Sequence, residues 1–332
     1  MLNFSIEPVK LELKYTWKIS RNSSDYKINF IVTVKDNDVV GRGEVAPNIR
    51  YNETPEIIQN EFERFQNSNP GNLISIQLFT DYLNNLHLPN ALRFGLEQAY
   101  VHYHCKKNKI SLCDFLNINA PTPIATCYTL PIMDAGLIKK FYNENNLQRF
   151  SFLKIKVNAE TGFEDVKTLC ALTDKPIMID GNEAWKDADE ALRFVNEIKK
   201  LNIEFVEQPM PSSMNDEYIY LKNHSPLPLM ADESVLANPD FDLLEKQFHA
   251  VNMKLMKAGG YLNGVRILNE ARKRNMKTMI GCMVETTLGI SGAMQLSAGI
   301  NYLDVDGYMI IKDEPFEFVK ESNGIVQLRI AE

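Results

Sequence analysis

The sequence lacks the features by which several large classes of protein are recognised. Its formal net charge is −7 and it has no basic run interleaved with aromatics, so neither nucleic acid nor a membrane is an expected partner. No apolar stretch approaches the roughly 20 residues that a membrane span needs. Glu7 interrupts the N-terminal segment before a secretory apolar region could form. Five scattered cysteines without a Cys-x-x-Cys pair fit reduced thiols, so we expect a cytoplasmic protein.

Patterns of two different periods occupy the first part of the 332 residues. From 1 to about 48, apolar and polar residues alternate as in β-strands. From about 54 to 105, apolar residues recur every three or four positions as in helices. Strands followed by helices predict a separate α+β capping domain over 1–120. The last segment, 308–332, alternates again, and we expect it to return to this domain.

Between 121 and 307, short apolar runs alternate with helical patterns such as 187–200 and 261–274. The runs end near Thr129, Lys156, Asp180, Glu207, Asp232, Lys254, Cys282 and Asp306, at intervals of 22 to 28 residues. Eight strand ends at one period predict an α/β fold of the (β/α) barrel type rather than an open doubly wound sheet. The carboxyl ends of the strands would then surround one mouth.

Three acidic residues end consecutive strands of this predicted barrel: Asp180, Glu207 and Asp232. Carboxylate oxygens select Mg²⁺, Mn²⁺ or Ca²⁺, and none of the five histidines stands at such a strand end, which argues against zinc. A single acid in this position more often caps the following helix. Three in consecutive units, with lysines on either side, favour a Mg²⁺ site, with Mn²⁺ as the alternative.

Lysines stand at strand ends on both sides of the three acids. Lys154 and Lys156 share one face of a strand, because side chains alternate with a period of two. Lys254 ends a strand four positions further round the barrel. Mutual repulsion and a nearby metal ion should lower the pKa of an amine here, so that one lysine can act as a base. Bases on opposite walls could address opposite faces of one substrate carbon.

Five motifs along the barrel, in this order, resemble those of the enolase superfamily, muconate-lactonizing subgroup. They are Lys-x-Lys (154–156), Asp-Gly-Asn (180–182), Glu-Gln-Pro (207–209), Asp-Glu-Ser (232–234) and Lys-Leu-Met-Lys-Ala-Gly-Gly (254–260). Residues 41–47 and 281–285 fit the same family, so the resemblance covers nearly the whole chain. It implies a modified (β/α)7β barrel, a TIM-barrel variant, whose mouth is capped by the first domain.

The resemblance also implies roles for the strand-end residues. Asp180, Glu207 and Asp232 would bind the metal. Lys156 and Lys254 would exchange a proton α to a carboxylate, and Lys154 would help electrostatically. In this superfamily, Mg²⁺ stabilises the enolate that forms when the proton leaves.

Asp304 and Asp306 lie on one face at the end of the eighth strand and resemble the Asp-x-Asp motif of dipeptide epimerases. Such acids would bind the ammonium group of a dipeptide. The alternative is a helix cap or a turn at Asp306. With the motif, the resemblance implies a metal-dependent isomerase that epimerises L-Ala-D/L-Glu, a dipeptide of cell-wall peptide turnover, at the C-terminal residue.

The loop from Lys18 to Lys27 is expected to fold over the mouth and contact the substrate side chain. It carries Arg21, which would suit an acidic side chain or else be merely solvated. Other candidate substrate-binding residues are Tyr51 and Ile49, which could line the other side of the lid, and the strand-end residues Thr129 and Cys282.

Two other functions stay open at this point. One is an o-succinylbenzoate synthase or muconate cycloisomerase on the same scaffold, against which only the Asp-x-Asp pair argues. The other is a catalytically silent ligand-binding barrel. Association into homo-oligomers is possible, and the sequence does not fix the side chains of the dipeptide.

Overall fold

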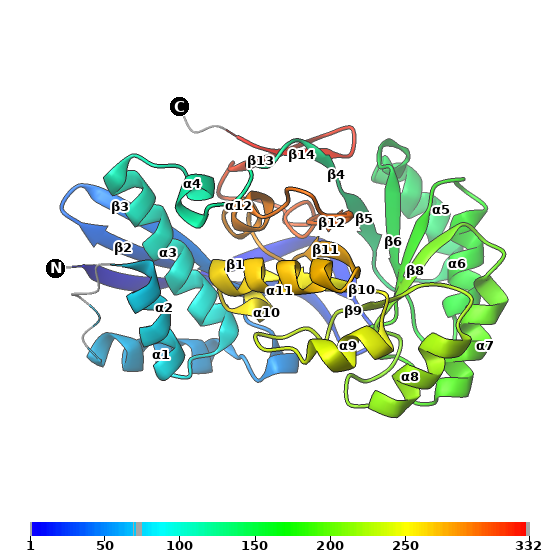
Figure 1. Cartoon of the computed structure of the whole chain (residues 1–332). Coiled ribbons are helices and arrows are strands. Elements are labelled where there is room, and N and C mark those ends of the chain that lie inside the picture. Colours follow the sequence, from blue (N-terminus) through cyan, green and yellow to red (C-terminus); the bar gives the residue numbers. More distant parts are fainter. Residues whose placement is uncertain (1, 69, 71–74, 330–332) are drawn as a thin grey trace.

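Two groups of elements lie side by side in the computed structural model, which describes residues 2–68, 70 and 75–329 (Figure 1). The first group, blue to cyan in the figure, is an antiparallel sheet in the order β1-β2-β3 with helices on one face. Its elements are β1 (Asn3–Lys18), β2 (Ser23–Asp36), β3 (Val39–Val45), η1 (Ile49–Tyr51), α1 (Pro55–Asn67), α2 (Ile76–Asn85), α3 (Asn90–Asn108) and α4 (Leu112–Leu116).

The second group is an eight-stranded parallel sheet whose strands follow one another in chain order from β5 to β12. The strands are β5 (Cys127–Leu130), β6 (Phe152–Lys156), β7 (Ile177–Asp180), β8 (Ile203–Glu207), β9 (Leu229–Ala231), β10 (Ala250–Lys254), β11 (Lys277–Gly281) and β12 (Tyr302–Asp304). The helices are α5 (Ala135–Glu144), α6 (Gly162–Cys170), α7 (Ala188–Ile198), α8 (Asn215–His224), α9 (Phe241–Gln247), α10 (Leu255–Ala258), α11 (Tyr261–Lys273) and α12 (Thr287–Gln295), with η2 (Leu147–Arg149) before β6.

The predicted (β/α)7β barrel is therefore confirmed. Each of the first seven strands is followed by helix, whereas the described residues after β12 form only strands and irregular structure. Every expected run end falls within two residues of an observed strand end. No helix in the described ranges is both long enough and apolar enough to cross a membrane.

The segment after the barrel contacts both groups of elements. Residues 310–312 lie against β1, where the Lys14 amide donates to the carbonyl of Ile310 (2.8 Å). Further on, β13 (Val319–Ser322) and β14 (Ile325–Leu328) pair with each other and with β4 (Ile124–Ala125), the short strand before the barrel. The C-terminal segment thus ties the first domain to the barrel.

Side chains inside the barrel form two layers of different character. Below lies a buried apolar cluster that includes Met178, Phe205 and Met230. Two residues further along each of these strands, and so on the same face, stand Asp180, Glu207 and Asp232. The apolar layer fills the barrel, and the charged layer above it lies at the mouth, where barrels of this kind hold their active sites.

Two glycines of β3 allow helix α3 to lie directly on the first sheet. A Cβ at Gly41 would lie 2.0 Å from the carbonyl oxygen of Ala99, and one at Gly43 would lie 2.0 Å from that of Gly95. Backbone atoms cannot give way as a flexible side chain can. Only glycine fits at these two positions.

Gly43→Ala is expected to lower the free energy of unfolding by about 1–3 kcal/mol or more, because the added methyl group forces α3 away from β3. The matched control is Gly136→Ala in the first turn of α5, an exposed site where the added Cβ would meet only the side chain of Asp134 (3.1 Å), so that stability should change by less than about 1 kcal/mol. Denaturant titration of both variants tests this. Equal stability of Gly43→Ala and the unmodified chain would contradict the close contact.

Candidate active site

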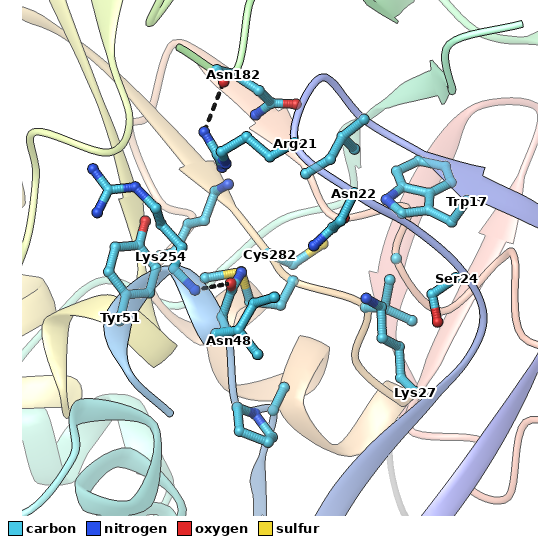
Figure 2. Close-up of a pocket in the computed structure, with 18 of the residues that line it drawn as sticks. Trp17, Arg21, Asn22, Ser24, Lys27, Asn48, Tyr51, Asn182, Lys254 and Cys282 are labelled. Carbon is cyan, nitrogen blue, oxygen red and sulfur yellow. Dashed lines mark hydrogen bonds between the residues drawn. The ribbon is translucent and has the colours of Figure 1, made fainter. Parts of the chain in front are cut away.

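The carboxyl ends of the barrel strands and two segments of the first domain enclose a cavity of about 620 Å³ (Figure 2). The barrel residues that line it are Thr129, Lys154, Lys156, Asn182, Asp232, Glu233, Lys254, Cys282, Met283, Val284, Asp304, Asp306 and Gly307. The first domain adds residues from the tip between β1 and β2 and from the segment around η1, among them Arg21 and Tyr51. The structure thus brings the residues predicted for catalysis and substrate binding to one cavity.

Lys154 lies at the centre of the charged layer. Its Nζ is 2.7 Å from Glu207 Oε2, 2.7 Å from Asp304 Oδ2 and 3.2 Å from Asp180 Oδ2, and its side chain is only 2% exposed. Three carboxylates from three strands therefore share one buried cation. Burial disfavours the charged amine, but the three carboxylates outweigh it and hold the pKa of Lys154 well above its ordinary value.

The other two lysines lie on strands four steps apart in the sheet, β6 and β10. Lys156 Nζ donates to Asp180 Oδ2 (2.8 Å) and to Asn182 Oδ1 (2.9 Å). Lys254 Nζ donates to Asp232 Oδ2 (2.9 Å). Each candidate base thus contacts a carboxylate that ends a neighbouring strand.

The sequence predicted a lowered amine pKa, but the contacts of Lys254 raise its pKa when no metal ion is bound. For Lys254, burial is the largest single effect and lowers the pKa, yet Asp232, Glu207 and Asp180 together outweigh it and the net shift is upward. The sequence argument counted the repulsion between lysines but not the number of carboxylates around them. A cation bound to those carboxylates would weaken this stabilisation of the ammonium forms.

Asp180, Glu207 and Asp232 fit a hard divalent cation by the chemistry of their oxygens. Glu207 Oε2 is buried and receives no well-directed hydrogen bond from the described residues. Neighbouring lysines hold the pKa values of Asp180 and Asp232 below their ordinary range despite burial, so both are ionised. Among the described side chains, no three His, Cys, Asp or Glu residues are already arranged as a metal cluster, and lysines contact these acids.

The backbone beside the acids is held in an uncommon conformation. Asn182, Glu183 and Gln208 all have positive φ, at 43°, 64° and 36°. Such conformations are costly for residues other than glycine and gather at functional sites. The Gln208 side chain also makes a contact between loops, since its Oε1 accepts a hydrogen bond from the amide of Asp232 (2.9 Å). It links the loops after β8 and β9.

Asp304 and Asp306 both contact Thr129, from which they lie across the barrel seam. Asp306 Oδ2 accepts the Thr129 amide (2.5 Å), and Asp304 Oδ1 accepts its hydroxyl (3.4 Å). Burial and the neighbouring Asp304 raise the pKa of Asp306 to about 7. An ammonium group bound beside the pair would favour its ionised form.

The tip between β1 and β2 is fixed to the barrel by Arg21. Its guanidinium contacts Glu183 Oε2 (3.0 Å), Glu233 Oε1 (2.8 Å) and the carbonyl of Asn182 (2.7 Å). The tip covers residues 19–22 only, so the loop predicted for 18–27 is too long. Residues 23–27 belong to β2, because Tyr26 and Lys27 pair with Glu12 and Leu11 of β1. A substrate contact of Arg21 remains a prediction.

Sequence reasoning missed Arg50, which fixes the second segment of the first domain. It donates from Nε and Nη2 to the two carboxylate oxygens of Glu183, each at 2.8 Å. It also missed Asn252, whose Nδ2 donates to Glu207 Oε1 (2.8 Å). Asn252 stands two residues before Lys254, so the period of two could have revealed it. No local pattern marks Arg50.

Comparison with known proteins agrees with this geometry. A family model described as "Enolase C-terminal domain-like" matches residues 139–322. The chain belongs to the enolase superfamily. It is similar to an L-Ala-D/L-amino acid epimerase of Pedosphaera parvula (33% identity, covering 98% of this chain and 95% of that one). It is also similar to an L-Ala-D/L-Glu epimerase of Bacteroides thetaiotaomicron (28%, covering 97% and 84%).

A solved structure of this superfamily shows the same fold. It is a dipeptide epimerase from Enterococcus faecalis, in complex with Mg and the dipeptide L-Leu-L-Tyr. The TM-score is 0.89 at 25% identity, and the match covers 99% of this chain and 97% of that one. Enzymes of the superfamily are metal-dependent. This chain therefore has the barrel and the capping domain of the superfamily.

Arg50→Met is expected to loosen residues 48–53, because the substitution removes two charge-assisted hydrogen bonds to the buried Glu183. Amide hydrogen exchange of this segment should accelerate about ten-fold, whereas exchange of the barrel strands should not change. Arg42→Met, at an exposed site of β3, is the matched control. Unchanged exchange in Arg50→Met would show that other contacts hold the segment.

Proposed function

We propose that this chain is a metal-dependent dipeptide epimerase that inverts the α-carbon of the C-terminal residue of its substrate. The observation that carries the proposal is the pair Lys156 and Lys254, which reach one cavity from strands four steps apart. The similarity to epimerases of L-Ala-containing dipeptides supports it. An L-Ala-D/L-Glu dipeptide is the substrate expected from the sequence, and the name of the Bacteroides relative supports it.

The two lysines divide one proton transfer between them. A lysine in its neutral form accepts the α-proton and becomes an ammonium. The lysine on the opposite wall, initially an ammonium, donates a proton to the other face of the same carbon and becomes neutral. Charge and proton count balance, and the configuration inverts. Lys154 keeps a fixed positive charge in the charged layer, because three carboxylates hold its proton.

Asp180, Glu207 and Asp232 would hold the cation, Mg²⁺ or Mn²⁺. When bound, it supplies positive charge for the carboxylate next to the reacting carbon. The chain itself prepares the site: Asn252 orients Glu207, Gln208 positions the backbone of Asp232, and Lys257 Nζ donates to Asp232 Oδ1 (2.6 Å).

Asp304 and Asp306 would bind the free ammonium of the dipeptide. They lie in the same cavity as the two bases and both are ionisable. An o-succinylbenzoate or muconate substrate has no cation to compensate this pair, so the pair favours the epimerase over these alternatives. A silent barrel is disfavoured because both candidate bases reach the cavity. Thr129, Tyr51 and Cys282 would complete the substrate contacts.

Two broader expectations accompany the proposal. The five cysteines lie in the described ranges as free thiols, which supports a reducing compartment such as the cytoplasm. Association into a homo-oligomer is the second expectation.

Lys156→Ala and Lys254→Ala should each abolish epimerisation of L-Ala-L-Glu, since inversion needs a group on both faces. Each variant should retain at most exchange of the α-proton in one epimer. Proton NMR in D₂O with Mg²⁺ follows both events, with the exposed Lys167→Ala as control. Retained turnover in either variant would remove the two-base mechanism.

Asp232→Asn should weaken Mg²⁺ binding by at least about ten-fold, because the cation loses one of three charged ligands. Calorimetric titration with Mg²⁺ measures this without turnover, and chelator treatment of the unmodified enzyme should stop exchange reversibly. The matched control is Asp242→Asn, at an exposed acid of α9. Equal Mg²⁺ affinity in Asp232→Asn would exclude this ligand set.

A further inference from the structure

Lys27 is the one basic residue of the cavity whose charge has no partner within the described chain. The other five are all engaged: Lys154, Lys156 and Lys254 with strand-end carboxylates, and Arg21 and Arg50 with Glu183 or Glu233. Lys27 lines the same cavity, and Figure 2 shows it among the residues there. Burial lowers its pKa, with no neighbouring charge acting on it.

The position of Lys27 on its strand explains why it reaches the cavity. Lys27 pairs with Leu11 of β1, and directly opposed residues share one face of a sheet. Leu11 is 2% exposed, and Asn29, two residues after Lys27, donates to the carbonyl of Val284 (2.9 Å) after β11. This face of β2 is therefore the face that meets the barrel.

An unpaired, half-buried ammonium is costly unless an anion joins it. The acidic pair Asp304 and Asp306 would bind the ammonium group of the substrate. A cation held by the three strand-end acids would bind the carboxylate next to the reacting carbon. Neither of these two substrate charges is left to match Lys27. A side-chain carboxylate on the C-terminal residue would supply the missing anion.

We infer that Lys27 determines specificity for an acidic C-terminal residue, and that Arg21 serves to anchor the tip of the β1–β2 hairpin. The inference rests on the proposed epimerase function. Lys27 thereby takes the contact with an acidic side chain for which the sequence offered Arg21, because the guanidinium of Arg21 already has two carboxylate partners.

The test compares exchange of L-Ala-L-Glu with that of L-Ala-L-Gln, a neutral substrate of the same shape, as a ratio of kcat/KM. The unmodified enzyme should prefer the glutamate dipeptide. In Lys27→Met the ratio should fall about ten-fold or more, the size expected for one lost charge-assisted hydrogen bond. Lys27→Arg should keep the preference, and Lys27→Glu should shift it toward L-Ala-L-Lys. Lys35→Met, exposed on the same strand, is the control.

The outcomes separate this inference from the proposed function. Exchange of dipeptides with an unchanged ratio in Lys27→Met, or with a preference for L-Ala-L-Gln in the unmodified enzyme, would overturn the role of Lys27 and leave the epimerase standing. A ratio that falls in Arg21→Met but not in Lys27→Met would return the role to Arg21. No exchange with any dipeptide would overturn both.

Discussion

The buried ammonium of Lys154 is the contact on which the rest of the site depends. Three carboxylates from β7, β8 and β12 would repel one another in a buried layer. One cation within 3.2 Å of all three makes their assembly possible. Lys154 is the middle residue of β6, so the strand fixes the position from which its side chain extends. The same contact orders the acids expected to hold a divalent cation and one of the acids expected to hold an ammonium. A single lysine thus connects the two halves of the charged layer.

The pattern along the chain predicts the barrel and its strand-end residues well, because both follow from local periodicity. A strand that ends in Asp, Glu or Lys after a short apolar run is visible without any knowledge of its neighbours. Contacts between distant segments leave no such trace. Arg50 and Glu183 are 133 residues apart, and neither residue type nor spacing identifies their pairing. The extent of the β1–β2 tip was misjudged for a related reason, since the polar residues 23–27 become a strand only through pairing with β1.

Electrostatics was the other limit on prediction from sequence. Counting strand-end lysines suggested a lowered amine pKa, but the balance depends on how many carboxylates lie within contact distance. Lys154 illustrates the point, because carboxylates of Asp180, Glu207 and Asp304 all lie within 3.2 Å of its amine. Only the folded arrangement shows how many carboxylates surround each lysine of the charged layer. The net direction of a buried titration is a property of the whole cluster rather than of one motif.

Chemistry and recognition are assigned to different parts of the fold. The candidate bases and metal ligands stand on or immediately after short parallel strands, each fixed by hydrogen bonds on both sides. The residues that would contact the variable part of a substrate come from the first domain, which reaches the barrel through charged contacts such as those of Arg21 and Arg50. Specificity can then change through the first domain without disturbing proton transfer. The half-buried Lys27 on the barrel-facing side of β2 is consistent with this division, since it contacts none of the catalytic carboxylates and is free to match a substrate charge.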